Sequence, residues 1–351
     1  MKKLMRFFYI LAMAAAIALT TGCEQYFEEL QTPVGLIAEM SLEEIAAAAD
    51  VALEDIEDMD VCAMVEELSE FINCDVLLLV LSNLCEAALA AKEEEVVCNI
   101  EEMLNELEEF MARFGDTISL FYRNIENDFI FSHNGDTVFF GASATKAPYA
   151  LYIFQKAEDG RTNLNTRLTY TEADFWEGSG IIRHRYEEGA TFTQRRLLHL
   201  MIAPSDNIAT RILRRQHGLA GYRQFMESIG ANPHFVQNLT YSYLSANEAG
   251  IIMGAIYDFI TSGGTYGPEL KSDLMSNRYP FIISDYPLAS KSGWAASFGG
   301  AYHDMAIVFA DSPYILAILS NKDGTIADRR IYENISMFFQ EFNNRWFVET
   351  D

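Results

Sequence analysis

The sequence predicts an α+β fold in which one antiparallel sheet is built from two distant parts of the chain. Alternating patterns rich in β-branched and aromatic residues occur at 117–142 and again at 287–321. Helical spacing of apolar residues dominates between them, from 144 to about 277, and an amphipathic helix is expected at 327–344. A helical region is thus inserted between two groups of strands, unlike the alternating strands and helices of a parallel sheet.

Turn residues separate the individual strands. Turns are expected at NIEND (124–128) and NGD (134–136) in the first group and at DSP (311–313) in the second. The strands are expected at 117–123, 129–133, 138–142, 287–293, 300–310 and 313–321. Short turns of this kind join antiparallel neighbours, so the sheet should be rich in hairpins.

Charge and length restrict the function. The chain has 351 residues and a formal net charge of -26. Nucleic-acid binding depends on Lys and Arg that neutralise phosphates, so nucleic acid is excluded as a partner, and anionic lipid headgroups would also be repelled. The length is sufficient for two domains and a large core, which an enzyme requires.

The first residues have the build of an export signal. A basic tip is followed by a short apolar stretch and by LTTGC, which resembles a bacterial lipobox ending at Cys23, although Thr20 replaces the usual aliphatic residue. Residues 1–23 are therefore expected to be a lipoprotein-type signal peptide. Lipidated Cys23 would hold the protein on the outer side of a bacterial cytoplasmic membrane. A plain signal peptide, giving a secreted protein, and a retained anchor are the alternatives.

Two segments separate this signal from the main domain. Residues 24–40 are expected to be a tether, and residues 41–98 an acidic helical segment that Ser41 and Glu44 open as a capping box. This segment shows no catalytic spacing, and its partner is not indicated by the sequence. The main domain is expected at 99–351.

Four cysteines lie in the acidic segment, and an exported protein can keep disulfides. Cys74 and Cys85 share nearly the same midpoint as Cys62 and Cys98, so nested pairs would suit two antiparallel helical arms. Four cysteines allow three connectivities, and free thiols packed as small apolar residues are the alternative.

A serine stands three residues before a lysine in GASATKAP, residues 141–148. Ser-x-x-Lys alone is weak evidence, because a chain of this length should contain about one by chance. Here a predicted strand precedes Ser143 and a predicted helix follows it, so Lys146 would lie one turn on and on the same side. A serine nucleophile needs a base, and a lysine serves only when burial or a second cation lowers its pKa.

A second lysine does occur, in Lys291-Ser292-Gly293 on a predicted strand, and Ser205-Asp206-Asn207 lies between the two motifs. Ser-x-x-Lys, Ser-Asp-Asn and Lys-Ser/Thr-Gly in this order are the three motifs of the penicillin-recognising serine enzymes. From about residue 99 onward the chain resembles the class A β-lactamase family. The resemblance implies a β-lactamase/transpeptidase-like fold.

The resemblance also implies roles for the motif residues, with a β-lactam or a D-Ala-D-Ala-like peptide as substrate and with no metal or organic cofactor. Ser143 would be the acylated nucleophile, Lys146 its base or proton relay, and Ser205 the donor to the leaving nitrogen. Backbone N–H groups of Ser143 and Trp294 would form the oxyanion hole. The substrate-binding residues would be Asn207 for the substrate amide, Lys291 and Ser292 for its carboxylate, and Gly293, which leaves room along the strand edge.

One departure from the family concerns deacylation. Class A enzymes carry a glutamate between the second and third motifs that activates water, yet residues 228–247 contain no Asp or Glu. Glu248 follows, but with Ser245 it is expected to form a capping box for the next helix. Tyr241, Ser242 and Tyr243 lie near the position of the missing glutamate. An acyl-serine enzyme is thus better supported than an efficient β-lactamase.

Other chemistries find less support. No Gly-x-Ser-x-Gly and no His-Glu-x-x-His occurs, GSG at 178–180 is too short for a phosphate loop, and adjacent His303 and Asp304 should face opposite sides of a strand. The functions left open are a β-lactamase with slow hydrolysis, a D-Ala-D-Ala carboxypeptidase-type peptidase, and a module that binds penicillin or wall fragments without hydrolysis. A purely structural lipoprotein is the remaining alternative.

Overall fold

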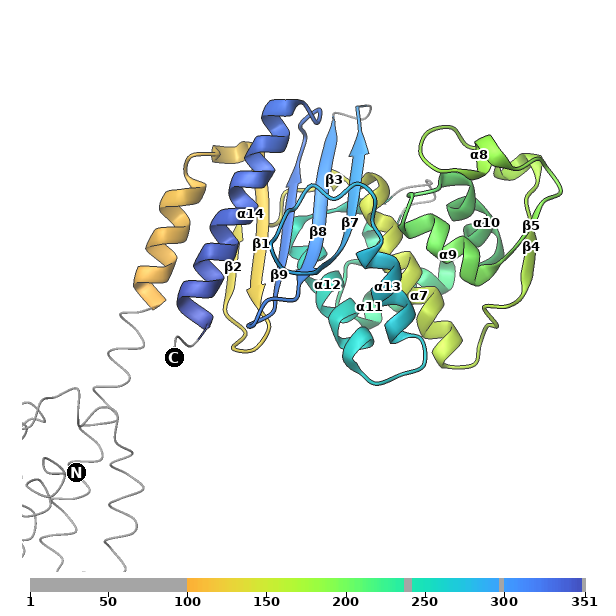
Figure 1. Ribbon diagram of the computed structural model, residues 1–351, viewed down its shortest axis with the longest axis horizontal. Helices are drawn as coiled ribbons and strands as arrows, with labels where there is room; N and C mark the ends of the chain where they lie inside the picture. The colour runs from red at the N-terminus through yellow and green to blue at the C-terminus, as the bar shows by residue number, and fades with distance from the viewer. Residues whose placement is uncertain (1–99, 237–241, 297–299, 349–351) are drawn as a thin grey trace, which may run out of the picture. The chain divides into compact units, whose positions relative to one another are not determined.

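The computed structural model describes residues 100–236, 242–296 and 300–348. The expected signal peptide, tether and acidic segment lie outside these residues, as do Cys23, Cys62, Cys74, Cys85 and Cys98. The chain divides into two compact units, Met1–Asn105 and Glu106–Asp351. The second unit contains all three motifs and is described below (Figure 1).

An antiparallel five-stranded sheet forms the centre of this unit, in the order β2-β1-β9-β8-β7 (Figure 1). Its first group of strands supplies β1 (Ile118–Asn124) and β2 (Ile130–His133), and its second group β7 (Leu288–Ala295), β8 (Ala301–Val308) and β9 (Tyr314–Ser320). Strand β1 pairs with β9 along its whole length, from Ile118 opposite Ser320 to Asn124 opposite Tyr314. The expected sheet from two distant parts of the chain is confirmed, and β7 lies at its edge.

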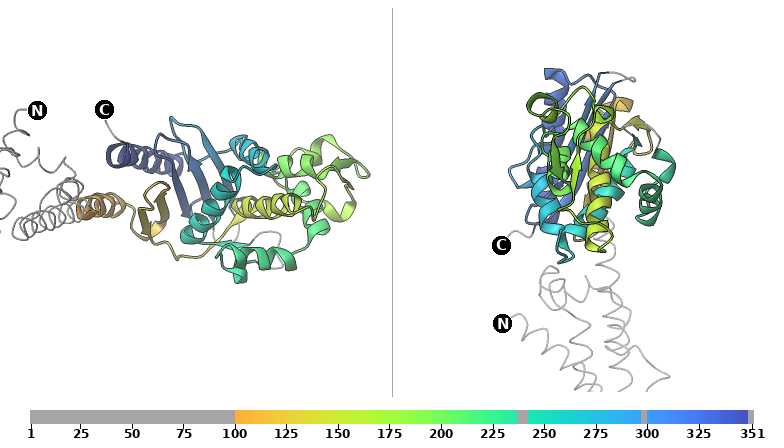
Figure 2. Two further views of the ribbon diagram at one scale, coloured as in Figure 1. Left: turned by 90° about the horizontal axis from the view of Figure 1, so that it is seen from below. Right: turned by 90° about the vertical axis from the view of Figure 1, so that its right-hand side faces the viewer.

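Helices cover both faces of the sheet. Phe121 and Tyr122 are neighbours on β1, so their side chains point to opposite faces. Tyr122 contacts Phe339 of α14 (Ile326–Phe347) at a ring-centroid distance of 5.2 Å. On the other face, a Cβ on Gly250 of α12 (Ala246–Thr261) would lie 2.3 Å from the Phe121 ring. The sheet is therefore enclosed between α14 and α12 (Figure 2).

The start of this unit packs against the C-terminal helix. Phe110 stacks on Phe338 with ring centroids 3.6 Å apart, and the Glu106 carboxylate accepts hydrogen bonds from Arg345 and Trp346 at 2.7 and 3.2 Å. Helical residues 106–111 thus lie beside α14 (Figure 1). None of the described helices combines the length and apolar character needed to cross a membrane.

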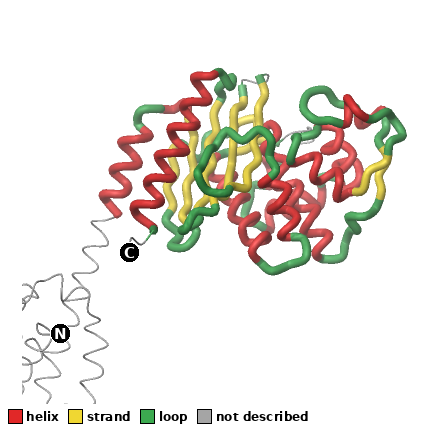
Figure 3. Tube along the Cα trace, in the orientation of Figure 1, coloured by secondary structure: helices red, strands yellow, loops and turns green. Residues whose placement is uncertain are grey.

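The inserted region is mainly helical, as expected, but it also contains short strands that the sequence pattern did not predict (Figure 3). These are β4 (Arg167–Thr169), which pairs with β5 (Thr191–Thr193), and β6 (Tyr243–Leu244). The strand expected at 138–142 is present as β3 (Phe139–Phe140), but it pairs with β6 and does not join the five-stranded sheet. Pairs of two or three residues are too short to show an alternating pattern. The helices are α7 (Lys146–Glu158), α8 (Ile182–Arg185), α9 (Gln194–Ile202), α10 (Asn207–His217), α11 (Ala220–Ser228), α12 and α13 (Gly267–Met275).

Helix α7 runs through the middle of the inserted region. Its residues from Lys146 to Phe154 are all buried, so it is apolar around its whole circumference except for the lysine at its start. Pro148 lies in the first turn, where a missing N–H breaks no hydrogen bond. A buried helix of this kind holds its first residue rigidly.

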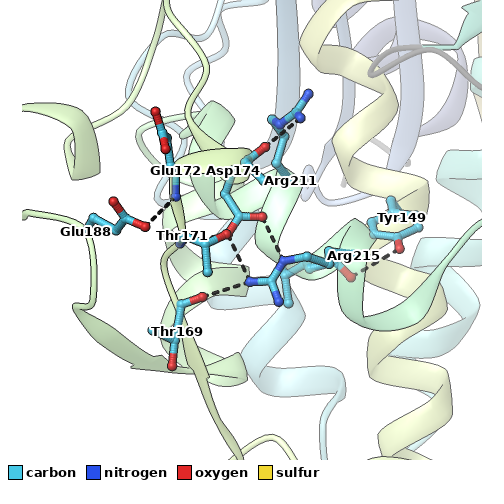
Figure 4. Close-up of polar contacts among 10 residues, drawn as sticks. Tyr149, Thr169, Thr171, Glu172, Asp174, Glu188, Arg211 and Arg215 are labelled. Carbon is cyan, nitrogen blue, oxygen red and sulfur yellow. Dashed lines mark hydrogen bonds and ion pairs between the residues drawn. The ribbon is translucent and has the colours of Figure 1, made fainter.

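An ion pair fixes the segment before α8 to α10. The carboxylate of buried Asp174 accepts two hydrogen bonds from Arg215, both 2.9 Å long, and a third from the Thr171 hydroxyl at 2.7 Å (Figure 4). Arg215 also donates to the Thr169 carbonyl. These hydrogen bonds lower the pKa of Asp174 although its burial opposes them.

Asp174→Asn should therefore lower the free energy of unfolding by about 2 kcal/mol at pH 7, because an amide NH2 would face the Arg215 and Thr171 donors. Since the folded-state pKa of Asp174 lies below its unfolded value, the contribution is present above about pH 4 and is lost as the pH falls further. Urea unfolding at several pH values measures it.

Asp128→Asn is the matched control. Asp128 pairs with Arg123 on the surface, with 71% of its side chain exposed, so its loss should change stability by less than about 0.5 kcal/mol. If both substitutions lowered the free energy of unfolding equally, the stabilising role given to the buried Asp174–Arg215 pair would be wrong.

Candidate active site

The three motifs meet in one cleft of about 300 Å³. Each motif contributes one serine to it, Ser143, Ser205 and Ser292. The other residues that line the cleft are Ser179, Tyr279, Phe281, Trp294, Tyr302, Gly324 and Arg329. Residues more than 140 positions apart in the sequence are thus brought together by the fold, as the motif order predicted.

Ser143 lies in a short 3-10 turn, Ala142–Thr145, between β3 and α7. Lys146 follows as the first residue of α7, so Ser143 precedes the helix rather than beginning it. In a 3-10 turn the side chains at positions i and i+3 eclipse each other, which still places Ser143 and Lys146 on one side.

The backbone before Ser143 is fixed from two sides. The Gly141 N–H donates to the Ser242 carbonyl at 2.9 Å, and buried His303 on β8 contacts the Phe140 carbonyl through Nε2 at 3.0 Å. Because His303 Nδ1 accepts from the Ser320 N–H, Nε2 is the protonated nitrogen. Burial lowers the pKa of His303 to about 4, so the ring is neutral, and its role is to hold the Phe140 carbonyl in place. His303 and Asp304 make separate contacts and do not form a dyad.

Two residues of the site have unusual backbone angles. Ala142 has φ 45° and Ser205 has φ 56°, a left-handed conformation that costs a residue with a Cβ of order 1 kcal/mol or more. Ala142 precedes Ser143 and Ser205 is itself a motif serine, so the surrounding structure must hold both residues in this conformation.

Lys146 makes three contacts with the second motif. Its Nζ donates to the Ser205 carbonyl at 2.6 Å and to the Asn207 side-chain oxygen at 2.8 Å, and it lies 3.1 Å from the Ser205 hydroxyl. Only 1% of the lysine is exposed. The amine is therefore oriented within hydrogen-bond reach of a cleft hydroxyl.

Burial lowers the pKa of Lys146 well below its ordinary value, and the charge of Lys291 lowers it further, while Asp206 opposes both. The expected second lysine therefore contributes, although burial is the larger cause. A lowered pKa favours the neutral form of the amine, which a base requires.

The GSG segment, set aside in the sequence as a turn, holds the second motif. Asp206 caps α10 by accepting from the Ala209 N–H and also accepts from the Ile181 and Ile182 N–H groups at 2.6 and 2.8 Å. The Ser179 hydroxyl donates to the Ser205 carbonyl at 3.0 Å. Gly180 has φ 123°, and a Cβ there would lie 2.4 Å from the Asp206 carboxylate. The close approach of this loop therefore requires a glycine.

Gly293 on β7 lies against the turn that carries Ser143. A Cβ at Gly293 would be 2.6 Å from the Ala144 nitrogen and 3.0 Å from the Ser143 nitrogen. The glycine thus permits the close approach of β7 to the nucleophile segment, a role in addition to the substrate clearance expected from the sequence.

Lys291 is not among the described residues that line the cleft. It is fully buried, and its Nζ donates to the Ser292 carbonyl at 2.8 Å. Burial lowers the pKa of Lys291 to about 8, and the nearby charge of Asp304 opposes this effect. Burial raises the pKa of Asp304 to about 7. The N–H groups of Phe281 and Ile282 donate to its carboxylate and oppose this rise in the pKa. Ser292 is the residue of this pair that reaches the cleft.

Several residues of the cleft were not found by sequence reasoning. Trp294 was assigned a role only through its backbone N–H, but the residue is 57% exposed and its side chain lines the cleft. Arg329, at the start of α14, was expected only as part of an amphipathic helix. Tyr279 and Phe281 belong to a segment without periodicity, and no spacing in the sequence links them to the motifs.

Glu248 does not line the cleft. The cap at the start of α12 is confirmed, because the Ser245 hydroxyl accepts from the Glu248 N–H at 3.2 Å. The second half of the expected capping box is wrong, since the Glu248 carboxylate accepts instead from the Asn232 N–H. The carboxylate is thus used to hold a neighbouring turn, and burial raises its pKa. Tyr241 lies outside the described residues, and the Ser242 carbonyl is used by Gly141.

Within the described ranges, no group of three or more His, Cys, Asp or Glu side chains is placed to hold a metal ion.

Comparison with known proteins agrees with this arrangement. The model of the Beta-lactamase enzyme family matches residues 100–337. The β-lactamase BRO-1 of Moraxella catarrhalis is 28% identical over 130 residues, which is 37% of this chain and two-fifths, 40%, of that protein.

Solved structures share the fold at low identity. PBP-A has a TM-score of 0.59 at 19% identity, with 68% of this chain and 96% of that chain covered. A PBP-A point mutant solved as its acyl-enzyme complex with penicillin G has a TM-score of 0.56 at 19% identity, covering 69% and 97%. A β-lactamase from Chitinophaga pinensis has a TM-score of 0.59 at 19% identity, covering 68% and 98%. With the family model matched over more than half of its length, the chain belongs to the β-lactamase enzyme family.

Proposed function

We propose that the protein is a serine acyl-transfer enzyme that is acylated at Ser143 by the amide of a β-lactam and hydrolyses the resulting ester slowly. Ser143 Oγ attacks the carbonyl carbon, and its proton passes to the Lys146 amine. A proton moves through the Ser205 hydroxyl to the lactam nitrogen as the C–N bond breaks. The ring opens, and the acyl group remains on Ser143 as an ester.

The observation that carries this proposal is the environment of Lys146. Its amine is buried, has a lowered pKa and lies 3.1 Å from the Ser205 hydroxyl. A neutral lysine in such a position can accept the proton of one serine and return it through another. The N–H groups of Ser143 and Trp294 are the proposed oxyanion donors, each worth about 3 to 4 kcal/mol in enzymes of this type.

The substrate carboxylate is assigned to Ser292 and to the exposed guanidinium of Arg329, since both line the cleft. The sequence predicted that Lys291 binds the substrate carboxylate directly. Its amine instead donates to the Ser292 carbonyl, and it supplies positive charge from that position. Asn207 is assigned to the substrate amide. Its side-chain NH2 also donates to the Glu177 carbonyl at 2.7 Å, which fixes the direction of the amide.

Slow release of the acyl group is supported by the composition of the cleft. The described residues that line it include no Asp or Glu, and Glu248 is occupied elsewhere. A base that activates water is therefore not supplied by a carboxylate of this lining. The same observation favours the alternative functions, a D-Ala-D-Ala carboxypeptidase-type enzyme or a penicillin-binding module that does not hydrolyse.

The proposed location is the outer side of a bacterial cytoplasmic membrane, through lipidation of Cys23. Support comes from the basic tip, the apolar stretch and LTTGC in residues 1–23. An exported enzyme would meet β-lactams and cell-wall peptides directly.

Ser143→Ala should abolish covalent labelling by penicillin. Intact mass spectrometry of the protein from residue 25 onward, at intervals after mixing, should show one adduct on the unmodified chain and none on the variant. An adduct on Ser143→Ala would refute the assigned nucleophile. On the unmodified chain, a slowly clearing adduct with opened drug supports slow hydrolysis, whereas one that never clears supports the binding module.

Lys146→Arg should slow acylation by about 100-fold or more, because arginine stays protonated and cannot act as a base. In the unmodified protein the lowered pKa of Lys146 should keep acylation near its maximum at neutral pH and reduce it at acid pH, where the amine gains a proton. Stopped-flow acylation against pH measures both effects. Lys156→Arg, on the same helix, is the control and should leave the profile unchanged.

Gly293→Ala should slow acylation by about 100-fold, since the added Cβ meets backbone atoms of the nucleophile segment. The same clash should cost about 1 to 3 kcal/mol of stability, which denaturant unfolding reports separately. Gly254→Ala on α12 is the matched control, because its nearest neighbour is a flexible Arg123 side chain at 3.3 Å. Unchanged acylation in Gly293→Ala would contradict the close approach of β7.

A further inference from the structure

The cleft is polar on one side and aromatic on the other. Its motif serines and Ser179 lie where the proposed chemistry takes place, whereas four of the other six lining residues are aromatic: Tyr279, Phe281, Trp294 and Tyr302. The proposed acylation uses the backbone of Trp294 but none of these four rings. The aromatic wall therefore needs a separate explanation.

The inner part of this wall is rigid. Phe281 stacks on Tyr302 with centroids 3.9 Å apart and an interplanar angle of 13°, and Tyr302 meets the Tyr332 ring edge-on at 4.8 Å. The Phe281 backbone is held by its N–H bond of 2.7 Å to buried Asp304. Rings fixed in this way present a preformed surface, which lowers the entropy lost on binding.

The outer part is fixed but open to solvent. The Trp294 Nε1–H donates to the Asp323 carbonyl at 2.9 Å although 57% of the residue is exposed. Gly324 allows the loop to approach, because a Cβ there would lie 2.9 Å from the Tyr302 ring and 3.1 Å from Trp294 Nε1. Tyr279 is also 55% exposed. Exposed apolar rings held in place at the end of a cleft are typical of a binding surface.

The register of the sheet places the wall relative to the substrate. Ser292 and Trp294 are two residues apart on β7, so their side chains share one face. Tyr302 is opposite Trp294 on β8 and lies on that same face. The aromatic wall thus begins beside the serine assigned to the substrate carboxylate.

Building on the proposed function, we propose that Phe281 and Trp294 form a subsite for a flat, unsaturated or aromatic substituent next to the carboxylate-bearing carbon of the substrate. Tyr302, which is 2% exposed, supports the Phe281 ring from behind. Stacking of such a group on the rings buries apolar surface on both partners. One well-placed aromatic pair contributes about fivefold to tenfold in affinity or rate.

The test compares two cephalosporins with the same acylamino side chain, one carrying a methyl group and the other a styryl group beside the carboxylate-bearing carbon. The second-order rate of Ser143 acylation is measured for each by intact mass or stopped flow. Trp294→Ala should lower the styryl-to-methyl rate ratio about fivefold to tenfold. Because the ratio is taken within each variant, general effects on the backbone N–H of residue 294 cancel.

Trp176→Ala is the matched control. Trp176 is 42% exposed and packs against Arg211, and it does not line the cleft, so its loss should leave the ratio unchanged. Phe281→Leu provides a second test and should lower the ratio in the same direction as Trp294→Ala.

A ratio that is the same in Trp294→Ala, Phe281→Leu and the unmodified protein would overturn the subsite while leaving the acylation proposal intact. An equal drop in the ratio in Trp176→Ala would also overturn it. Failure of both compounds to label Ser143 would instead refute the proposed function on which the subsite rests.

Discussion

The burial of Lys146 is the constraint on which the rest of the site depends. A charged ammonium at a position with 1% exposure is unfavourable, so the surrounding structure favours the neutral amine. The Ser205 and Asn207 oxygens then orient that amine instead of leaving it unpaired. Helix α7 is buried along most of its length, and this is what removes water from its first residue. The electrostatics of the site therefore follow from the packing of a helix core.

Close backbone approaches place the second and third motifs around this lysine. Gly293 brings β7 against the turn that carries Ser143, and Gly180 brings the 178–182 loop against Asp206. Each approach leaves no room for a Cβ, so each joins two segments that are distant in the sequence. Lys291, in the third motif, contributes through its charge, which lowers the pKa of Lys146. Several loops on a rigid sheet and helix scaffold thus act as one site.

The groups around the cleft suit the proposed acylation better than the proposed deacylation. Two lysines and three serines supply the groups that acylation needs, while the described lining residues offer no carboxylate for water activation. Glu248 is the acidic residue nearest in the sequence to the position of the missing glutamate, and its carboxylate accepts a hydrogen bond from the Asn232 N–H. The aromatic wall on the other side of the cleft adds recognition without adding a base. This distribution is the basis for proposing a long-lived acyl-enzyme.

The sequence by itself determined the strands of the sheet, the C-terminal helix and the three motifs with Ser143, Lys146, Ser205 and Lys291, because periodicity and short motifs are local properties. Three features depend on tertiary packing. The buried Lys291 amine donates to the Ser292 carbonyl, and Ser179 and Arg329 line the cleft. The Glu248 carboxylate accepts from the Asn232 N–H. The aromatic wall combines Trp294 of β7 and Tyr302 of β8 with Tyr279 and Phe281, which come from a segment without periodicity. Burial, close approach and the direction of a side chain depend on what packs against a residue, and no local pattern contains that information.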